Sequence, residues 1–406
     1  MKIIFFSNQL FDYPLKTNKW HVATRVAERG HQVLFVDPPI RLRKLVKQIF
    51  QGRWSLSRLL TGFYYPWLSE DREGGKQRRK KSLLKVFTPV TTTVSESPNL
   101  ANFNVNRMRK QFPEFFAGDA ILWVYNPAMI SYLDLVSRQL LIYDCVDDYP
   151  SMANYKQLGL SREIAEKEKA IAGKADLVFA TTRNLVRKLK KWNKKVHYLG
   201  NAGDYGRFAA VARGGREKGS CGEAPILSNI PRPRIGFTGA IDSYKLNLPL
   251  LVTIAEDHPN KSLVLVGPTG VADSQPDLRQ LKQLDNVYFI GRRPYEQMPS
   301  FFAGFDVFII PYNLNDYTLG GCFPVKFLDA LAAGLPTVVT NLPAYEDFSE
   351  VAYIADDDKQ FSKFIQKALG EDSPERQQAR MRIARENSWS SKVEKMLDLI
   401  NHAKMA

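Results

Sequence analysis

The chain has 406 residues, a formal net charge of +15 at pH 7, and 44% hydrophobic and 24% charged residues. This composition is typical of soluble globular proteins, and the length predicts two domains that each bury a core. Three cysteines and five histidines without paired ligand spacing give neither a disulfide framework nor a zinc motif. No apolar run approaches the ~18 residues of a membrane span, and the N-terminus lacks signal-peptide features, so we expect a cytoplasmic protein.

Apolar strands alternate with helical patterns along the chain. In the first half the predicted strands are 3–7, 32–36, 120–125, 140–144, 177–180 and 196–198. In the second half they are 234–238, 262–266, 287–290, 307–310 and 337–340. Alternation of this kind predicts parallel sheets covered by helices on both faces.

A stretch rich in Gly and Pro and poor in periodicity, residues 211–233, separates these two sets of strands. It is typical of a linker between domains. We therefore predict one Rossmann-like domain over residues 1–210, a second over 234–385, and a terminal helix over 386–406.

Residues 41–85 carry most of the excess charge, with 13 Lys/Arg against three acidic residues. An amphipathic basic stretch, RLRKLVKQIFQGRWSLSRLL, opens this segment, and Trp54 and Trp67 lie within it. These features suit peripheral attachment to an anionic membrane leaflet. Residues 183–195 form a second basic cluster without an acid. Nucleic acid is a competing partner, but no recognised nucleic-acid motif accompanies the charge, and a solvated basic face is the third interpretation.

In the first half, polar residues end two of the predicted strands. Tyr125 and Asn126 stand before a proline in WVYNPAM, and the run YDCVDD supplies Asp144, Asp147 and Asp148. The spacing DxxDD is similar to a metal site, while polar termination of a strand is the simpler interpretation.

In the second half, the loops that follow the strands carry glycine and basic residues. Ligands of open α/β sheets bind at the carboxyl ends of strands. Gly239 allows close backbone approach to a ligand, and Lys245 can reach a diphosphate. Arg292 and Arg293 follow the strand 287–290; they suit contacts with a base or a phosphate, or are simply solvated.

The stretch FPVKFLDALAAGLPTVV, residues 323–339, predicts a helix that begins at a ligand. Pro324 suits the first helical position and Gly334 the helix end. Upstream, TLGGCF gives flexible backbone whose N–H groups, with the helix N-terminus, can hold a phosphate. Lys326 and Asp329 share one face of this helix, where the simpler interpretation is a surface ion pair.

The motifs PVKFLDALAAGLPTVVTNLP, FDVFIIPY and YDCVDD resemble those of bacterial glycosyltransferases of teichuronic-acid and related surface-polysaccharide pathways. These belong to the retaining GT-B glycosyltransferases, which include glycogen- and sucrose-synthase-like enzymes. The resemblance spans nearly the whole chain and is most specific over residues 286–343. It implies an α/β GT-B fold with two Rossmann-like domains facing across a cleft, an acceptor in the first, a nucleotide-sugar donor in the second, and a last helix that returns to the N-terminal domain.

The resemblance implies a donor site formed by Gly239, Lys245, Arg292, Thr318, Gly320, Gly321, Cys322, Phe323, Lys326 and Asp329. Asp329 takes the place of the second of two family acids, which binds the donor ribose, and Gly321 stands where the first acid is expected. Lys326 would stabilise charge on the leaving diphosphate, so no metal or other cofactor is required.

On the acceptor side the resemblance implies roles for Lys16, Asn18, Lys19, Tyr125 and Asn126, and it implies catalytic roles for Asp147, Asp148 and Lys326. The family histidine before proline is absent from WVYNPAM. The run NAGDYGRF, residues 201–208, resembles an Asn-Gly-x-Asp element and is predicted to be structural.

The predicted function is transfer of a sugar from a nucleotide-diphosphate donor to a lipid-linked or polysaccharide acceptor, with retention. The enzyme is expected on the inner face of the membrane, attached through residues 41–85, without a nucleic-acid partner. One alternative is a non-catalytic GT-B scaffold, because the first acid and the family histidine are missing. The other is a nucleotide-sugar 2-epimerase, which the small number of histidines disfavours.

Overall fold

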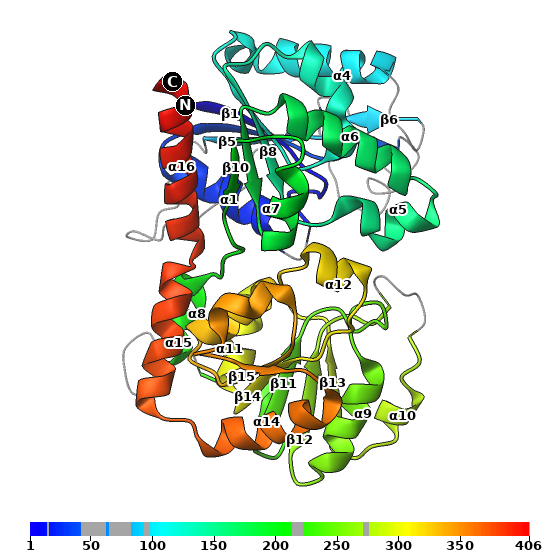
Figure 1. Cartoon of the computed structure of the whole chain (residues 1–406), viewed down its shortest axis with the longest axis vertical. Helices are drawn as coiled ribbons and strands as arrows, with labels where there is room; N and C mark the ends of the chain where they lie inside the picture. The colour runs from blue at the N-terminus through cyan, green and yellow to red at the C-terminus, as the bar shows by residue number, and fades with distance from the viewer. Residues whose placement is uncertain are drawn as a thin grey trace. The chain divides into compact units, whose positions relative to one another are not determined.

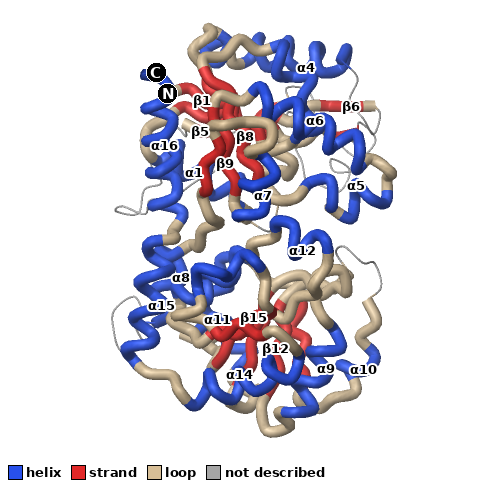
Figure 2. The backbone as a smooth tube through the Cα atoms, in the orientation of Figure 1, coloured by secondary structure: helices blue, strands red, loops and turns tan. Residues whose placement is uncertain are grey.

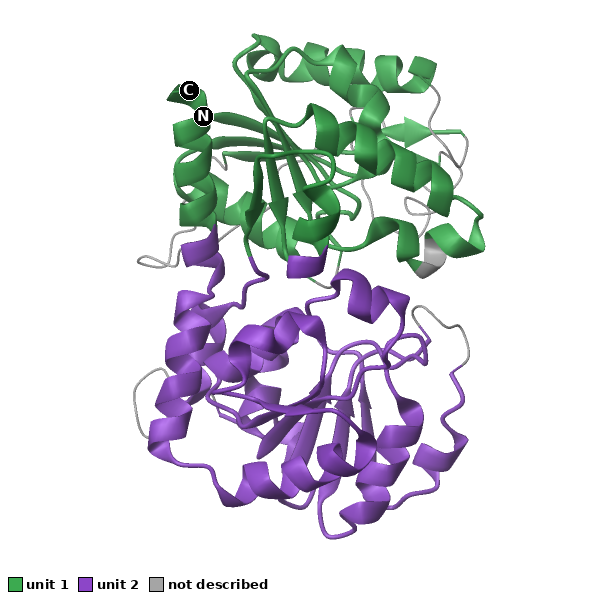
Figure 3. Ribbon diagram, in the orientation of Figure 1, with its two compact units in different colours: residues 1–181, 185–199, 393–406 green, residues 182–184, 200–392 purple. Residues whose placement is uncertain are grey.

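The computed structural model describes residues 1–13, 16–41, 62–64, 83–92, 98–212, 222–270 and 276–405. The chain forms two compact units, coloured separately in Figure 3. Unit 1 comprises residues 1–181, 185–199 and 393–406, and unit 2 comprises 182–184 and 200–392.

Unit 1 is built on a sheet in the order β10-β9-β8-β7-β1-β2-β5-β4. Its strands are β1 (Lys2–Phe6), β2 (Gln32–Val36), β4 (Phe63–Tyr64), β5 (Leu84–Phe87), β7 (Ile121–Val124), β8 (Leu140–Cys145), β9 (Leu177–Ala180) and β10 (Val196–Tyr198), and β3 (Ile40–Arg41) pairs separately with β6 (Val90–Thr91). All pairs are parallel except β4 with β5. Every residue of β7 and β8 is buried, as expected for parallel strands covered on both faces.

Helices cover this sheet, as the tube in Figure 2 shows. They are α1 (Asn18–Glu28), α4 (Pro98–Gln111), α5 (Ala153–Gln157), α6 (Ser161–Lys174) and α7 (Arg183–Leu189), with the 3₁₀ helices η1 (Pro113–Phe116), η2 (Pro127–Leu135) and η3 (Tyr149–Ser151). Apolar residues of α4, η2 and α6 join the strands in one continuous core, which includes Met108, Tyr132 and Ile171. The core forms because each helix buries its apolar face against the sheet.

Unit 2 has a fully parallel sheet in the order β13-β12-β11-β14-β15-β16. Its strands are β11 (Arg234–Thr238), β12 (Ser262–Val266), β13 (Val287–Gly291), β14 (Val307–Ile310), β15 (Thr337–Thr340) and β16 (Tyr353–Ala355). Figure 1 shows this sheet between its helices. The α-helices are α8 (Tyr205–Ala212), α9 (Leu248–Asp257), α10 (Arg279–Lys282), α11 (Met298–Ala303), α12 (Asp316–Gly321), α13 (Val325–Ala332), α14 (Asp358–Gly370), α15 (Pro374–Glu386) and α16 (Trp389–Met405), and the 3₁₀ helices are η4 (Pro225–Leu227), η5 (Tyr295–Gln297) and η6 (Pro343–Phe348).

The units divide at Leu199 and Gly200 rather than after residue 210. The reason is that α8 packs against α11, α13 and α15, which are all in unit 2. Residues 222–233, the described part of the predicted linker, also belong to unit 2, where the Arg234 guanidinium donates to the Leu227 carbonyl. At the other end, α16 begins in unit 2, and its residues from Val393 onward belong to unit 1.

The predicted strands are present, with ends shifted by no more than one residue. The sequence pattern missed β3, β4, β5, β6 and β16. Leu84 and Lys85 lie in β5, paired with β2, so the end of the basic segment 41–85 is part of the sheet. Residues 42–61 and 65–82 of that segment lie outside the described residues. Among the helices of the described residues, none combines the length and apolar character that crossing a bilayer requires.

Candidate active site

Two glycines end neighbouring strands at the carboxyl edge of the unit 2 sheet. Gly239 follows β11 with φ +135°, and Gly267 follows β12 with φ +154°. A Cβ atom on Gly267 would lie 1.8 Å from the Gly239 carbonyl oxygen, and one on Gly239 would lie 2.1 Å from Lys326 Nζ. Only glycine fits at either position, and the backbone therefore lies directly against the Lys326 amine.

Lys326 extends from the first turn of α13 and is only partly exposed. Its Nζ lies 4.2 Å from the ring centroid of Phe237 and 5.6 Å from that of Tyr312. Within the described part of the chain it makes no hydrogen bond and no ion pair, so the surface ion pair with Asp329 does not form. Burial, followed by the charge of Lys245, lowers the pKa of Lys326 to about 7. A cation without an anionic partner is suited to an anionic ligand.

Lys245 lies in the loop after β11. Its Nζ donates to the Tyr317 hydroxyl at 3.3 Å and lies 4.8 Å from that ring centroid. Asn313 holds the loop by donating to the carbonyl of Ser243 at 2.8 Å. Lys245 lowers the pKa of Lys326, so the two amines repel each other electrostatically. The sequence pattern missed Tyr317, whose aromatic ring and position before Thr318 were its only signal.

Asp242 is a second residue that the sequence pattern missed. It is 1% exposed, and its carboxylate opposes the lowering of the Lys326 pKa. Its Oδ1 accepts from the backbone N–H of Lys245 at 3.2 Å and so shapes the loop that carries Lys245.

The predicted glycine loop is wrong, because Thr318, Gly320 and Gly321 lie in α12. Asn315 caps this helix by accepting from the backbone N–H of Tyr317 and Thr318. The Thr318 hydroxyl donates to the Asn313 carbonyl at 2.6 Å and accepts from the Asn315 N–H at 3.0 Å. This capping box stabilises a helical turn where the glycines alone favour a loop.

The residues that join α12 to α13 are buried. Cys322 forms no disulfide within the described residues, is 6% exposed, and acts electrostatically on Lys326. Phe323 packs edge-on against Phe348, with ring centroids 5.8 Å apart. Pro324 is the N-cap of α13 and Val325 the first helical residue, so the predicted position of Pro324 was wrong by one residue.

Asp329 is buried on α13, 5% exposed. Its Oδ1 accepts from the backbone N–H of Asp204 at 2.8 Å. Gly334 follows the helix with φ +75°, as predicted for the helix end. At the end of β13, Gly291 has φ +76°, Arg292 is exposed, and Arg293 donates to the Ile290 carbonyl at 3.2 Å. Asp329 and Arg292, both predicted on the donor side, thus differ in their surroundings. The Asp329 carboxylate is held by a backbone N–H, whereas the Arg292 side chain is exposed to solvent.

In unit 1, Tyr125 follows β7 and is fully buried. Burial, followed by Asp144, raises its pKa well above the usual value. Asn126 caps η2, because its Oδ1 accepts from the Ala128 N–H at 3.0 Å. Lys19 lies 5.8 Å from the Tyr125 ring centroid and is 5% exposed. Among the predicted acceptor-side residues, Lys19 and Tyr125 are therefore close neighbours.

The remaining acceptor-side residues lie at the start of α1. Lys16 lies 5.1 Å from the Trp20 ring centroid. Asn18, the first residue of the helix, is buried, and its Oδ1 accepts from the Lys19 N–H at 3.1 Å.

The three aspartates of YDCVDD have different surroundings. Asp144 accepts from the Trp123 indole at 3.0 Å, within the core. Asp148 accepts from Lys188 Nζ at 2.6 Å and from the Ser151 hydroxyl. Asp147 is half-buried, and its carbonyl accepts from the Tyr149 N–H at 3.0 Å. The described residues contain no group of three or more His, Cys, Asp or Glu side chains that can hold a metal ion.

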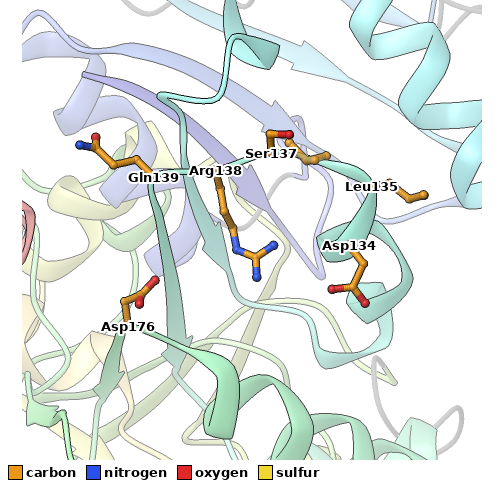
Figure 4. Close-up of a pocket in the computed structure, with 7 residues that line it drawn as sticks. Asp134, Leu135, Ser137, Arg138, Gln139 and Asp176 are labelled. Atoms are coloured by element: carbon orange, nitrogen blue, oxygen red, sulfur yellow. The ribbon is translucent and has the colours of Figure 1, made fainter.

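A pocket of about 520 Å³ in unit 1 lies away from all predicted site residues. It is lined by residues 134–139 and Asp176, which precede β8 and β9 and are drawn in Figure 4. Asp176 accepts from the Leu141 N–H at 2.7 Å, and Arg138 donates to the Leu133 carbonyl at 2.6 Å. The pocket thus lies at the amino ends of the strands, whereas ligands of such sheets bind at the carboxyl ends.

Comparisons with known proteins agree with this geometry. A model of the family described as glycosyl transferases group 1 matches residues 232–371, which lie in unit 2. The chain is 27% identical over 282 residues to a Bacillus subtilis (strain 168) protein named "Putative teichuronic acid biosynthesis glycosyltransferase TuaH", covering 66% of this chain and 68% of that protein.

Solved structures share the whole fold at low identity. Sucrose-phosphate synthase from Thermosynechococcus elongatus superposes with a TM-score of 0.65 at 14% identity, covering 99% of this chain and 98% of that one. Anabaena HepE in complex with UDP gives 0.66 at 13% identity, covering 99% and 100%. An E. coli protein titled as trehalose-6-phosphate and bound with UDP-2-fluoro glucose gives 0.67 at 12% identity, covering 100% and 99%.

These comparisons confirm the fold class and the enzyme class predicted from the sequence. The chain is a glycosyltransferase with the GT-B fold, and it is similar in sequence to a Bacillus subtilis protein named for teichuronic acid biosynthesis.

Proposed function

We propose that this enzyme transfers a sugar from a nucleoside-diphosphate donor to a lipid-linked or polysaccharide acceptor, with retention at the anomeric carbon. One observation carries the proposal: the Lys326 amine lies beside Gly239, Lys245 acts electrostatically on it, and neither amine has a carboxylate partner within the described residues. A diphosphate supplies the missing negative charge. The solved structures with UDP and UDP-2-fluoro glucose support this choice of ligand class.

In the proposed reaction, the bond between the anomeric carbon and the diphosphate oxygen breaks, and its electron pair passes to that oxygen. The acceptor hydroxyl oxygen bonds to the anomeric carbon on the same face, and its proton passes to the leaving phosphate. Lys326 and Lys245 stabilise the charge that develops on the diphosphate. Asp329 binds the donor ribose, and Arg292 the base or its phosphates.

Calorimetric titration with UDP, GDP, ADP and dTDP tests the donor. We expect one of these to bind the wild-type enzyme and to lose affinity in Lys245→Ala and Lys326→Ala, while Asp329→Asn impairs nucleoside recognition. Unchanged affinity in all three variants would remove the donor site. Incubation of the corresponding nucleotide sugar without acceptor tests the epimerase alternative, because an epimerase converts the donor whereas a transferase or a scaffold leaves it largely intact.

We also propose that residues 41–85 attach the enzyme to the anionic inner face of the membrane. Each basic residue near such a surface contributes about 1 kcal/mol, and salt screens this term. Replacing Arg78, Arg79, Lys80 and Lys81 with Gln should sharply lower co-sedimentation with anionic vesicles.

The matched control for membrane attachment replaces Lys190, Lys191, Lys194 and Lys195, four exposed lysines of unit 1, with Gln. It removes the same charge from a different place, so a smaller loss of vesicle binding is expected. Equal losses in the two variants, or full competition by duplex DNA, would contradict the assignment to residues 41–85.

A further inference from the structure

Residues 201–204 of unit 2 lie along the helix that carries Lys326 and Asp329. The Asn201 side-chain amide donates to the Phe323 carbonyl at 2.9 Å, just before α13. The Asp204 backbone N–H donates to Asp329 Oδ1 at 2.8 Å. Two hydrogen bonds thus attach this segment to the donor helix, and one of them ends on the predicted ribose-binding carboxylate.

Gly203 brings the segment into direct contact with α13. A Cβ atom there would lie 2.8 Å from Leu328 Cβ and 2.9 Å from the Leu328 backbone carbonyl carbon. On its other side, the Gly203 N–H donates to the Asn387 carbonyl, and its carbonyl accepts from the Trp389 N–H, both at 3.1 Å. The segment cannot retreat, because α13 lies on one side and the start of α16 on the other.

The Asp204 side chain reaches a second element of the donor site. Its Oδ2 accepts from the Tyr295 hydroxyl at 3.4 Å and from Arg207 Nε at 3.2 Å. The Arg207 guanidinium also lies 4.9 Å from the Tyr295 ring centroid. Tyr295 begins η5, directly after the turn that contains Arg292. Asp204 therefore contacts both the helix of Asp329 and the start of η5, which follows the loop of Arg292.

We propose that Gly203 and Asp204 are positioning residues for the nucleoside half of the donor. They fix the Asp329 carboxylate and the turn after β13 relative to each other, while the diphosphate half depends on Lys326 and Lys245. The inference deepens the proposed function and rests on it. A carboxylate held by a backbone N–H meets a ribose hydroxyl without first being ordered, which conserves affinity.

Gly203→Ala tests this proposal, with Gly206→Ala as its matched control. A Cβ atom at Gly206 meets nothing within 4 Å, so the control adds the same methyl group without a contact. Affinity is measured for two probes, inorganic pyrophosphate and whichever of UDP, GDP, ADP and dTDP binds the wild type. Gly203→Ala should weaken nucleoside-diphosphate binding about tenfold and pyrophosphate binding less than twofold. The control should change neither affinity.

A double-mutant cycle with Asp329→Asn identifies the route of the effect. If Gly203 acts through Asp329, Gly203→Ala has little further effect on nucleotide affinity in the Asp329→Asn background. Equal losses for both probes, or additive losses in the cycle, would overturn the proposal.

Asn201→Ala provides a second variant, since it adds no atom and removes the hydrogen bond to the Phe323 carbonyl, together with the local one that Asn201 Oδ1 accepts from the Ala202 N–H. It should weaken nucleoside-diphosphate binding about threefold with pyrophosphate unchanged, and unchanged nucleotide affinity would count against the positioning role. A wild type that binds neither probe would refute the proposed donor site itself. The inference is supported if the wild type binds both pyrophosphate and the nucleoside diphosphate, and if Gly203→Ala and Asn201→Ala weaken binding of the nucleoside diphosphate alone.

Discussion

Two lysines, one in each unit, have opposite surroundings. In unit 1, Lys188 Nζ lies 2.6 Å from Asp148 Oδ1 and 2.6 Å from Glu168 Oε2. Burial alone would lower its pKa, but Glu168 and Asp148 together raise it. In unit 2, Lys326 has no ion pair within the described residues, and burial together with Lys245 lowers its pKa to about 7.

The difference separates charges that hold the fold from charges that await a ligand. Glu168 also accepts from the Tyr143 hydroxyl at 2.8 Å, so the Lys188 network ties α7 to α6 and β8. Its charges are compensated within the protein. The Lys326 charge is compensated only in part, by Asp242 and Asp329 without an ion pair, which costs stability in the free enzyme and is recovered when a diphosphate binds.

The largest expected effect is on stability, in Lys188→Met. Removing one partner of a buried ion pair leaves Glu168 uncompensated, so the free energy of unfolding should fall by about 3–5 kcal/mol. Nucleoside-diphosphate affinity should stay within twofold. Urea unfolding and calorimetry measure the two quantities, and Lys190→Met, at an exposed site nearby, serves as the control. A large loss of affinity in Lys188→Met would place this network in the donor site.

Lys326→Met should weaken nucleotide binding without lowering the stability of the free enzyme. Loss of a charge-assisted contact to phosphate costs ~1.5–3 kcal/mol, so nucleoside-diphosphate affinity should fall about tenfold or more. The thermal midpoint of the free enzyme should rise, because a poorly compensated cation is replaced by an apolar side chain of similar length. Differential scanning calorimetry with and without nucleotide checks both effects. A lower midpoint together with unchanged affinity would make Lys326 a structural residue.

The pH dependence of donor binding sharpens the comparison further. Below pH 7 the Lys326 amine is protonated and ready for the diphosphate, while above pH 7 binding must take up a proton. Affinity should therefore fall by up to about tenfold per pH unit from pH 7 to 9. Titration calorimetry in buffers of different ionisation enthalpy measures this proton uptake. Lys326→Met should bind weakly but with a flat profile, and an equally flat wild-type profile would contradict the lowered pKa.

The smallest effect is expected at Thr318, where a polar group is fully paired. Thr318→Val removes the hydroxyl that donates to the Asn313 carbonyl and should lower the free energy of unfolding by about 1 kcal/mol. Nucleotide affinity should change less than twofold, because that hydroxyl already serves the cap of α12. Measured affinity that falls tenfold would restore Thr318 as a direct ligand.

The sequence predicted the parts of this fold that local pattern controls. Continuous apolar runs such as 262–266 and 307–310 gave the central strands, because a parallel strand buried on both faces requires them. The strands β3, β4 and β6 were missed because two residues carry no periodicity, and β5 and β16 were missed as well, with β5 overlapping the end of the basic segment 41–85. The glycine pair before Cys322 suggested a loop, and the Asn315 capping box overrode it.

The candidate site also has features that the sequence predicted and features that it did not. Gly239 and Lys245, in the loop after β11, and Lys326, in the first turn of α13, were predicted as donor-side residues from the sequence, because ligands of open α/β sheets bind at the carboxyl ends of the strands. The electrostatic state of the lysines could not be predicted from the sequence. The pairing of Lys188 with Asp148 and the lack of an ion pair at Lys326 depend on contacts between distant segments. The hydrogen bond from the Asp204 backbone N–H to Asp329 Oδ1 is another contact between segments that are distant in the sequence.

The sequence by itself thus determined the fold class, the enzyme class and the edge of the sheet at which to look. Only the tertiary structure decided which charges there are compensated, because compensation depends on burial and on partners that chain spacing does not specify.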